Sequence, residues 1–417
     1  MLLIPSKKKK TRHCAVETIR DPRDFYLPLD AYRGTLEPIV ELGQKIRKYQ
    51  CVAHLEGTFA TRLHAPVSGR IKAFVLIDGK QYIHLENDFK DLEMAVSSLD
   101  TTKLTVEGFS EILAQLGIEG SGGSRFPTQM KYRVKEGRIE TLIFNGVECE
   151  PYLSADTVLM KEKGEELLRA AQLVQSVLKA RRVIFVIEKQ NSDVRIILDN
   201  EAKKLGIPVE FCMVSNTYPQ GGELQVIRSV TGLELKKGEI PGLYGILLNN
   251  VGTLWAIYRG IFEGKPYTER VLTISGNQST GQGNYWVKIG TPVSHLLNEA
   301  QNKFDVEGCL VVLGGAMMGK AVFSLSTGVN KGSGGLLLLK KQKKAALNCI
   351  KCGACVDVCP QRLMPLEFVR HVENKSVGLL RAFYLQNCIE CGACAYVCPS
   401  HVPLMENIFK GKNMLSS

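Results

Sequence analysis

The middle of the chain alternates between stretches of helical periodicity and short runs of consecutive apolar residues. Three stretches carry apolar residues at the spacing of an amphipathic helix: 100–117, 163–178 and 192–206. Three others, "TLIFNG", "RRVIFVIE" and "PVEFCMV", are typical of buried strands: 141–146, 181–188 and 208–214. Strands and helices that alternate at these lengths predict an α/β domain with a largely parallel sheet, which we place at residues 96–265.

The segments on either side of this domain have β-like patterns. Residues 1–95 contain "VELGQKIRKYQCVAHLEG" and "LHAPVSGRIKAF", which look like a biotinyl/lipoyl-type barrel-sandwich module. The lysine that such modules carry between two hydrophobic residues is missing, so we predict a structural packing or docking module. Residues 266–340 are predicted to form a smaller unit that resembles a β-grasp (SLBB-like) domain. The predicted fold class is therefore α/β and multidomain.

Length and charge set broad limits on function. A chain of 417 residues can bury several cores. No apolar run reaches the ~18 residues of a membrane-spanning helix, so the chain is expected to be cytoplasmic or docked on a membrane. The formal net charge of +11 fits a solvated basic face, or attraction to acidic partners or lipid headgroups. No basic stripe with interleaved aromatic residues is present, so no nucleic-acid partner is expected.

The cysteines are concentrated near the C-terminal end, where eight of the thirteen lie between Cys349 and Cys398. "CIKCGACVDVCP" begins at Cys349 and "CIECGACAYVCP" at Cys388, and each is the Cys-x2-Cys-x2-Cys-x3-Cys-Pro run of a bacterial ferredoxin. Disulfide frameworks are typical of short secreted chains, and zinc sites prefer cysteines in pairs. The runs therefore predict two [4Fe–4S] clusters in a ferredoxin-like domain at residues 341–417.

The fourth cysteine of each run is expected to serve the other cluster, as it does in two-cluster ferredoxins. The first predicted ligand set is Cys349, Cys352, Cys355 and Cys398. The second predicted ligand set is Cys388, Cys391, Cys394 and Cys359. Gly353 and Gly392 would let the backbone pass close to the cluster sulfides, because glycine has no Cβ.

Clusters of this kind accept one electron at a time, so a hydride donor needs a flavin between itself and the clusters. The segment "GIEGSGGSRFPTQMK" is a candidate phosphate loop. Gly120, Gly122 and Gly123 would let backbone N–H groups approach an anion, and Lys131 would add positive charge. Taken alone, a glycine cluster is more often a plain loop.

A second candidate segment, "FNGVECEPYLSAD", follows at the end of a predicted strand. Ligands of open α/β sheets bind at the carboxyl ends of strands. Asn145 is suited to hydrogen-bond a flavin ring, and Glu148 and Glu150 to meet a ribose or a carboxamide. The alternative for this segment alone is a solvated acidic turn.

The candidate motifs occur in an order that resembles a known family. The series is "GGSRFPTQMK", "NGVECEPYLSAD", "YPQGGELQVIRSVTG", "NNVGTLWAI", "GGAMMG" and the paired cysteine runs. It resembles the C subunit of the Rnf complex, a membrane ferredoxin:NAD oxidoreductase that couples electron transfer to ion translocation. The α/β domain is similar to the NADH-binding flavoprotein subunit of respiratory complex I.

The resemblance implies FMN on the glycine loop and NADH stacked on the flavin. It implies cofactor-binding roles for Gly120, Gly122, Gly123, Lys131, Asn145, Glu148, Asn250 and Thr253, and catalytic roles for Glu150 and Glu223. One residue departs from the family pattern, because Arg125 stands where glycine is usual ("GGSRFPT" against "GGAGFPT"). We expect its side chain either to crowd the phosphate or to bind it through the guanidinium.

The function implied by the resemblance is that of an NADH-dependent flavo-iron–sulfur oxidoreductase subunit. It would pass electrons between NAD(H), FMN and two [4Fe–4S] clusters, and indirectly serve a ferredoxin-type carrier. Attachment would be peripheral, through other subunits of the complex, at the cytoplasmic face of the cell inner membrane. Two alternatives stay open. One is a soluble relative such as the cobalamin reductase of bacterial microcompartments, and the other is an electron-wiring subunit with a vestigial flavin site.

Overall fold

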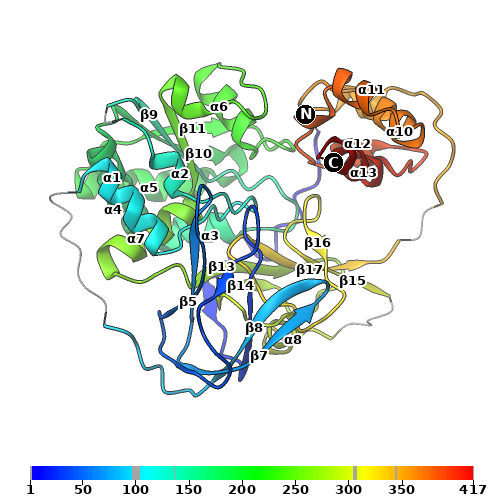
Figure 1. Ribbon diagram of the computed structural model, residues 1–417. Helices are drawn as coiled ribbons and strands as arrows, with labels where there is room; N and C mark the ends of the chain where they lie inside the picture. Colours follow the sequence, from blue (N-terminus) through cyan, green and yellow to red (C-terminus); the bar gives the residue numbers. More distant parts are fainter. Residues whose placement is uncertain (1, 96–103, 136, 304–307, 343–344, 417) are drawn as a thin grey trace.

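The computed structural model of the chain describes residues 2–95, 104–135, 137–303, 308–342 and 345–416. Figure 1 shows an α/β domain at the upper left, two β-rich units below it and a helical lobe at the upper right. The α/β domain and the lobe lie above the β-rich units on opposite sides of the molecule.

A four-stranded parallel sheet forms the centre of the α/β domain. In spatial order its strands are β11 (Glu210–Val214), β10 (Arg182–Glu188), β9 (Thr141–Asn145) and β12 (Ile246–Asn250). Its helices are α1 (Val106–Gln115), α2 (Gln129–Tyr132), α3 (Ala155–Glu162), α4 (Gly164–Leu178), α5 (Ser192–Leu205), α6 (Glu223–Thr231) and α7 (Val251–Glu263), with the short η2 (Lys189–Asn191) and η3 (Pro241–Tyr244). The predicted α/β fold is confirmed, although residues 100–103 of the first predicted helix lie outside the described residues.

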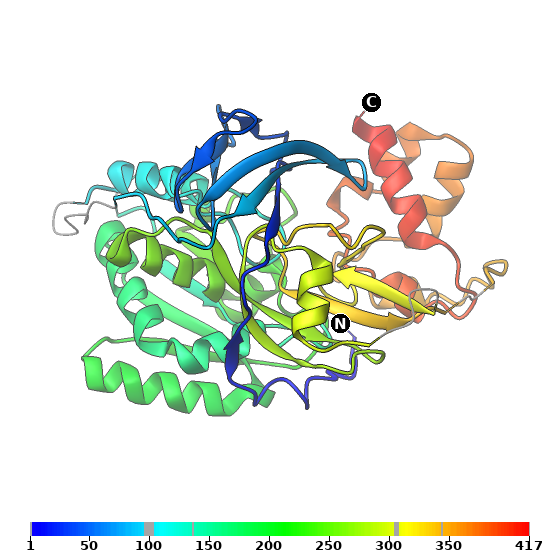
Figure 2. The ribbon, with the colours of Figure 1, turned by 90° about the horizontal axis from the view of Figure 1, so that it is seen from below.

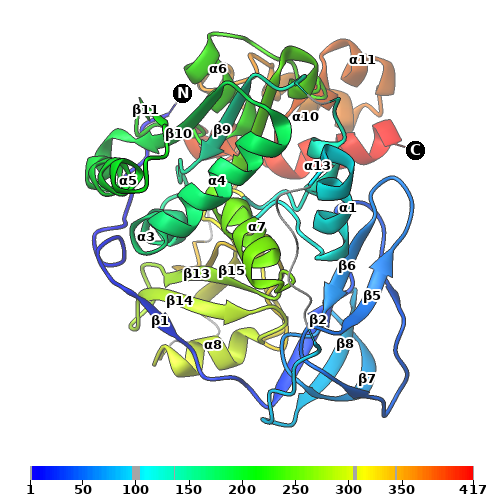
Figure 3. The same ribbon diagram turned by 90° about the vertical axis from the view of Figure 1, so that its left-hand side faces the viewer.

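Both faces of this sheet are covered, because successive strand residues point to opposite sides. In β9, Leu142 and Phe144 join a large core with α1, α3, α4, α5 and α7. Ile143 packs on the other face with Val226 of α6. Figure 3 shows α4 and α7 lying in front of the sheet. Because helices cover both faces, a ligand can reach the sheet only at the strand ends. Asn145 ends β9 and Asn250 ends β12.

A six-stranded sheet forms the centre of the first β-rich unit. In spatial order its strands are β1 (Val16–Thr18), β14 (Gly283–Lys288), β13 (Glu269–Ser275), β17 (Gly335–Lys340), β15 (Cys309–Leu313) and β16 (Lys320–Ala321), and α8 (Val293–Glu299) packs beside it. Its edge strand β1 is parallel to β14, with Val16 opposite Asn284. We call residues 2–18 the N-terminal segment, and Figure 2 shows the dark-blue chain that contains β1 running along this unit. The beginning of the predicted 1–95 module thus belongs to this sheet.

The second β-rich unit is the barrel-sandwich. One of its sheets contains β2 (Asp24–Pro28), β8 (Lys80–Asn87), β7 (Gly69–Ile77) and β4 (Lys45–Ile46), and the other contains β3 (Glu37–Pro38), β5 (Cys51–Leu55) and β6 (Thr61–His64). Phe25 and Leu85 share one core with Leu272 and Leu336 of the six-stranded sheet. The two units are therefore one hydrophobic body, which meets the α/β domain where β6 contacts α1 (Figure 3).

The helical lobe follows β17. Its helices are α9 (Ala354–Asp357), α10 (Pro365–Glu373), α11 (Val377–Ala382), α12 (Ala393–Val397) and α13 (Leu404–Ser416), with the short η4 (Leu385–Asn387). Phe368, Leu380 and Ile408 form its small core, and cysteines of both runs border that core. The helices thus surround the cysteine-bearing loops.

Candidate flavin and iron–sulfur sites

The eight cysteines of the two runs gather into two groups in the lobe. A cavity is lined by three cysteines of the second run and the last of the first: Cys388, Cys391, Cys394 and Cys359. In the other group, burial raises the pKa of Cys355, and the nearby Cys349 and Cys398 raise it further. The fourth cysteine of each run thus lies with the other run, as crossed ligation requires. We call Cys349, Cys352, Cys355 and Cys398 the first group. We call Cys388, Cys391, Cys394 and Cys359 the second group.

The backbone around both groups favours thiolates. Lys351 N donates to Cys349 Sγ, and Glu390 N donates to Cys388 Sγ, each at 3.4 Å. Each run then turns through a glycine with a left-handed backbone: Gly353 (φ 81°) and Gly392 (φ 73°). No three His, Cys, Asp or Glu side chains in the described part of the chain converge closely enough to hold a single metal ion. Hydrogen bonds to the sulfur favour its charged form, which is the form that binds iron.

The glycine loop between α1 and α2 is closed at its base and open at its tip. Gly120 N donates to Phe126 O at 2.9 Å, which closes the base. Gly123 has a left-handed backbone (φ 101°), and nothing lies within 4 Å of the position that a Cβ would take. Glycine is needed there for its conformation, and the open tip fits a loop that receives an anion.

The loop rests on the start of α7, next to the ends of two strands. Ser121 N donates to Thr253 Oγ1 at 2.9 Å. A Cβ on Gly122 would lie 3.6 Å from Asn250 Cβ. Asn250 ends β12 and is the register partner of Asn145, which ends the adjacent strand β9. The structure therefore brings together four of the predicted cofactor-binding residues.

The two asparagines are held by protein partners. Asn250 Oδ1 accepts from Gly252 N at 2.8 Å and caps α7, while its Nδ2 donates to Asp156 Oδ2 at 2.6 Å. Asn145 Nδ2 donates to Gly221 O at 2.9 Å. Sequence reasoning did not single out Asp156, a half-buried residue that follows the "YLS" stretch at the start of α3. These bonds fix the wall beside the glycine loop.

Glu148 caps the start of α3. Its carboxylate accepts from Asp156 N and from Thr157 Oγ1, each at 3.2 Å. Burial raises the pKa of Glu148 to about 7. A carboxylate at a helix N-terminus is favoured by the helix dipole, so this residue has a structural task beside its predicted cofactor role.

Glu150 connects the α/β domain to the loop between β15 and β16. Its carboxylate accepts from Met317 N at 2.9 Å and from Met318 N at 3.0 Å. A Cβ on Gly315 would lie 2.2 Å from Glu150 Cδ, so the "GGAMMG" loop needs its glycine for this approach. Burial raises the pKa of Glu150 to about 7. Its catalytic role stays a prediction.

Lys131 and Glu223 form an ion pair with an N–O distance of 2.6 Å. Lys131 also donates to Leu248 O at 2.8 Å, near the end of β12. Glu223 is the first residue of α6, where the helix dipole favours its charge. The cation predicted at the phosphate and the carboxylate predicted at the nucleotide are therefore neighbours.

Sequence reasoning missed a buried cation in the N-terminal segment. Lys8 is 3% exposed, donates to Glu148 O, and lies 3.8 Å from Glu188 Oε2. Ser6 O accepts from Tyr152 N at 2.8 Å, which holds the segment in place. The only signal was the run "SKKKK", and its spacing does not tell which lysine is buried.

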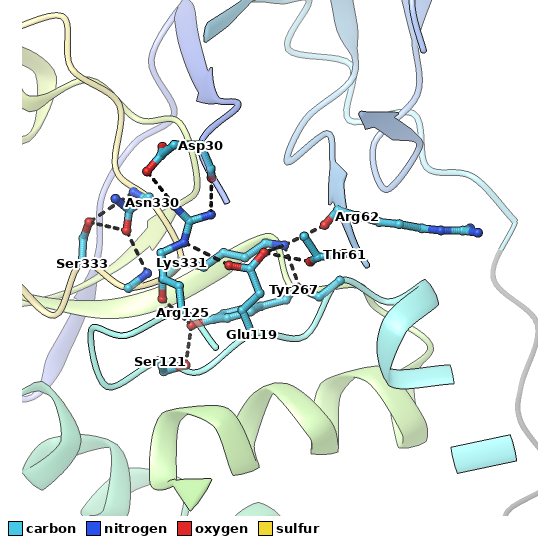
Figure 4. A network of polar contacts seen from close by, with 12 residues as sticks. Asp30, Thr61, Arg62, Glu119, Ser121, Arg125, Tyr267, Asn330, Lys331 and Ser333 are labelled. Carbon is cyan, nitrogen blue, oxygen red and sulfur yellow. Dashed lines mark hydrogen bonds and ion pairs between the residues drawn. The ribbon is translucent and has the colours of Figure 1, made fainter. Parts of the chain in front are cut away.

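Arg125 lies in a buried polar network between three units (Figure 4). Its Nε donates to Glu119 Oε2 and its Nη1 to Asp30 Oδ2, each at 3.0 Å, and its Nη2 donates to Asp30 O at 2.6 Å. Its φ of 55° is left-handed, as a glycine at this position would allow. The structure shows neither of the outcomes expected for this side chain, because protein oxygens bind its guanidinium.

Glu119 is the centre of this network and is fully buried. Its Oε1 accepts from Lys331 Nζ at 3.0 Å and from Thr61 Oγ1 at 2.9 Å. Burial opposes ionisation, but Lys331 and Arg125 together hold the pKa of the carboxyl below its usual range. The network joins the barrel-sandwich (Asp30 and Thr61) and the six-stranded unit (Lys331) to the glycine loop (Figure 4).

A small hollow adjoins the glycine loop. Its lining is Ser121, Asp156, Leu159, Gly252, Trp255, Tyr267, Arg270 and Val271. The buried Arg270 donates to Ser121 O at 3.2 Å, which brings positive charge to the loop. With the open tip at Gly123 and the start of α7 beside it, these groups fit a phosphate-bearing cofactor such as FMN.

An α/β domain with an open glycine loop, joined to a lobe with two four-cysteine groups, defines the class of a flavo-iron–sulfur redox subunit. Three family models match the chain in this order. They are the RnfC barrel sandwich hybrid domain (residues 2–87), the Nuo51 FMN-binding domain (113–259) and the 4Fe–4S dicluster domain (348–402).

Relatives named as the C subunit of an ion-translocating oxidoreductase complex match nearly the whole chain. The Haemophilus influenzae (strain PittEE) protein is 33% identical over 96% of this chain and 62% of its own length. The Buchnera aphidicola protein is 30% identical over 95% of this chain and 85% of its own length. The chain belongs to this family of C subunits. The chain spans less than two thirds of the length of several other relatives, such as 50% of a second Haemophilus influenzae protein and 47% of a Vibrio cholerae protein.

The fold is also similar to a chain of an NAD⁺-reducing [NiFe]-hydrogenase in the H2-reduced state. The TM-score is 0.54 at 15% identity, over 76% of this chain and 64% of that one. At this identity the likeness concerns the fold alone. None of the helices in the described part of the chain has the length and apolar character needed to cross a bilayer.

Proposed function

We propose that this chain passes electrons between NAD(H) and a membrane-bound partner by way of FMN and two [4Fe–4S] clusters. The observation that carries the proposal is the pairing of an open glycine loop with two crossed four-cysteine groups in one molecule. The match to an FMN-binding domain and the name shared by the relatives support it.

Bound FMN would supply the exchange between hydride transfer and single-electron transfer. Gly122 and Gly123 would offer their N–H groups to the FMN phosphate, and the start of α7 would add further N–H groups. Gly120, whose N–H donates to Phe126 O, would close the base of the loop. Asn145 and Asn250 would form the wall beside the flavin. They are suited to this because their own partners keep both side chains in place.

Glu150 and Glu223 are proposed to act on the nucleotide beside the ends of β9 and β12. Glu150 is held by the amides of the "GGAMMG" loop, and Glu223 is held by Lys131. The pKa of about 7 at Glu150 would let this group exchange a proton near neutral pH.

We further propose that the chain is a peripheral subunit at the cytoplasmic face of a cell membrane. Integral subunits would anchor it, as the complex in the relatives' name suggests. The net charge of +11 would favour an acidic electron carrier of the ferredoxin type or anionic headgroups. High salt should release the chain from membranes, whereas release by detergent alone would contradict peripheral attachment.

The proposal is tested by anaerobic purification followed by stopped-flow reduction. The chain should contain about eight irons and one FMN, and NADH should bleach the flavin before the clusters. A chain with both clusters but no FMN would favour the electron-wiring alternative. Co-purification with integral membrane subunits would separate the proposal from a soluble cobalamin reductase.

A further inference from the structure

The contact between the helical lobe and the α/β domain centres on one tyrosine. Tyr218 is 1% exposed and donates from its Oη to Cys391 O at 2.7 Å. Tyr218, Cys391 and Ala393 form a small apolar cluster, against which Cys149 and Met317 pack. A ligand residue of the second group is therefore bonded to the α/β domain in a contact that excludes water.

Further contacts reach the same side of the lobe. Lys237 Nζ donates to Cys388 O at 2.6 Å. A Cβ on Gly392 would lie 3.1 Å from Met317 O, so the second run passes close to the loop that Glu150 holds. Arg362, three positions after Cys359, pairs with Glu234 at 3.1 Å. Each contact involves a member of the second group or one of its near neighbours.

The segment that follows Tyr218 contacts the end of β9, where the flavin is proposed to bind. Gly221 follows three residues after Tyr218, and its carbonyl accepts from Asn145 Nδ2 at 2.9 Å. A Cβ on Gly221 would lie 2.5 Å from Val147 O, so the two segments are in direct contact. Tyr218 thus bonds to the second group from a segment that touches the end of β9.

The first group differs in exposure. Cys349 and Cys352 are exposed, whereas Cys391 and Cys394 of the second group are buried. Ile350, between the two exposed cysteines, is 67% exposed. The first group therefore has a face open to solvent.

We infer that Tyr218 is a positioning residue that fixes the second group beside the end of β9, so that the second group is the one nearer the flavin. The role of this arrangement in electron transfer rests on the proposed function, whereas the hydrogen bond between Tyr218 and Cys391 is independent of it. A single electron would cross between the α/β domain and the second group. No bond is made or broken in this transfer, and Tyr218 keeps its hydroxyl proton. The first group would exchange electrons with a partner through its exposed face.

The first test needs neither FMN nor NADH. Tyr218→Phe removes only the hydroxyl, and Tyr244→Phe is the matched control, because Tyr244 is 49% exposed in the same domain. Both variants should keep about eight irons. In Tyr218→Phe we expect amides 388–394 to exchange hydrogen about three- to tenfold faster, the effect of one lost hydrogen bond, while amides 349–355 are unchanged.

Potentiometric EPR supplies a second readout, the midpoint potential of each cluster. A purely structural role of Tyr218 would leave both potentials unchanged. Tyr218→Phe should shift the midpoint potential of the second group's cluster alone, because the carbonyl that loses its donor belongs to a ligand of that cluster. Lys237→Met removes one of the two lysine donors to Cys388 O, the other being Lys412, and should shift the same signal. Cys349→Ala, which removes a ligand of the first group only, identifies which signal is which.

The inference is overturned if Tyr218→Phe matches Tyr244→Phe in both measurements, or if the changes fall on the first group. A third measurement adds NADH to FMN-loaded protein. Tyr218→Phe should leave flavin bleaching unchanged and slow cluster reduction about three- to tenfold. If NADH fails to bleach the flavin of the parent protein, the proposed function fails, while exchange and potentials still decide the role of Tyr218.

Discussion

The helical lobe and the α/β domain place their functional residues by different means. In the lobe, all eight proposed ligands come from two short runs of similar sequence. Around the glycine loop, the residues come from two strand ends, four helices, the N-terminal segment and both β-rich units. A local motif contains most of its own geometry, whereas a site built from distant segments depends on its neighbours. Substitutions in the lobe should therefore remove one cofactor, and those around the loop should affect several units at once.

The largest expected effect tests the lobe half of this comparison. Cys359→Ala should remove the cluster of the second run, although Cys359 belongs to the first, and iron should fall from about eight to about four per chain. Its residual EPR spectrum should match that of Cys388→Ala, and Cys398→Ala should match Cys349→Ala. Cys212→Ala, outside the lobe, is the control and should keep both clusters. If Cys359→Ala instead matched Cys349→Ala, the crossed arrangement would be wrong.

The next largest effect is expected in the buried network of Glu119, Arg125 and Lys331. It tests whether the site around the glycine loop depends on neighbouring units. Lys331→Met leaves the fully buried Glu119 without one of its two cations. Breaking a buried pair should lower the free energy of unfolding by about 3 kcal/mol, measured by urea denaturation. Lys203→Ala breaks an exposed pair with Asp199 and should change the free energy of unfolding by less than about 0.5 kcal/mol. Equal effects of the two substitutions would show that the network does not hold the units together.

The Lys131–Glu223 pair should give a smaller effect, which sharpens the comparison within the flavin site. Each alanine variant should weaken FMN or nucleotide binding, or slow flavin reduction, about tenfold through one lost charge-assisted bond. Because the two side chains bond to each other, the double variant should lose less than the product of the single effects. Fluorescence titration of FMN and stopped-flow reduction measure both. Strictly multiplicative losses would mean that the residues act separately.

The smallest expected effect is the pH dependence caused by Glu150. Its pKa is raised to about 7, so the folded chain binds more protons than the unfolded chain above pH 4.5. Stability should therefore fall as pH rises from about 4.5 to about 7. The full shift would correspond to about 3 kcal/mol, and solvent screening of this partly buried carboxyl reduces the expected change to the order of 1 kcal/mol. Glu150→Gln should flatten that part of the profile in urea titrations, and the exposed Glu37→Gln should not. A profile that Glu150→Gln leaves unchanged would contradict the assignment.

Sequence reasoning was effective where spacing alone sets the geometry. The two cysteine runs placed Cys359 with the second group, and the lining of that cavity agrees. Apolar runs such as "RRVIFVIE" predicted a buried parallel strand, and β10 is buried between β9 and β11. Each cysteine run and each apolar run is a signal within a dozen residues, whereas the crossing of Cys359 to the second group was inferred from the pattern of two-cluster ferredoxins.

Long-range contacts lay beyond such reasoning. Nothing near Tyr218 in the sequence shows that its hydroxyl meets Cys391, and nothing in "SKKKK" shows that Lys8 is buried near Glu188. Arg125 was expected either to crowd the phosphate or to bind it, because it stands where the family usually has glycine. Its partner Asp30 is far away in sequence and could not be inferred from spacing. Each of these side chains is placed by another unit of the fold.

The pairing of β1 with β14 has a consequence for the order in which the molecule is completed. Val16–Thr18 leave the ribosome long before their partners Asn284–Trp286 are synthesised. Leu2 likewise waits for Tyr218, with which it forms a backbone bridge. Contacts this distant in sequence form late, because the entropy of closing so long a loop must be overcome first. Leu2 and residues 16–18 are therefore expected to reach their places after the α/β domain has formed.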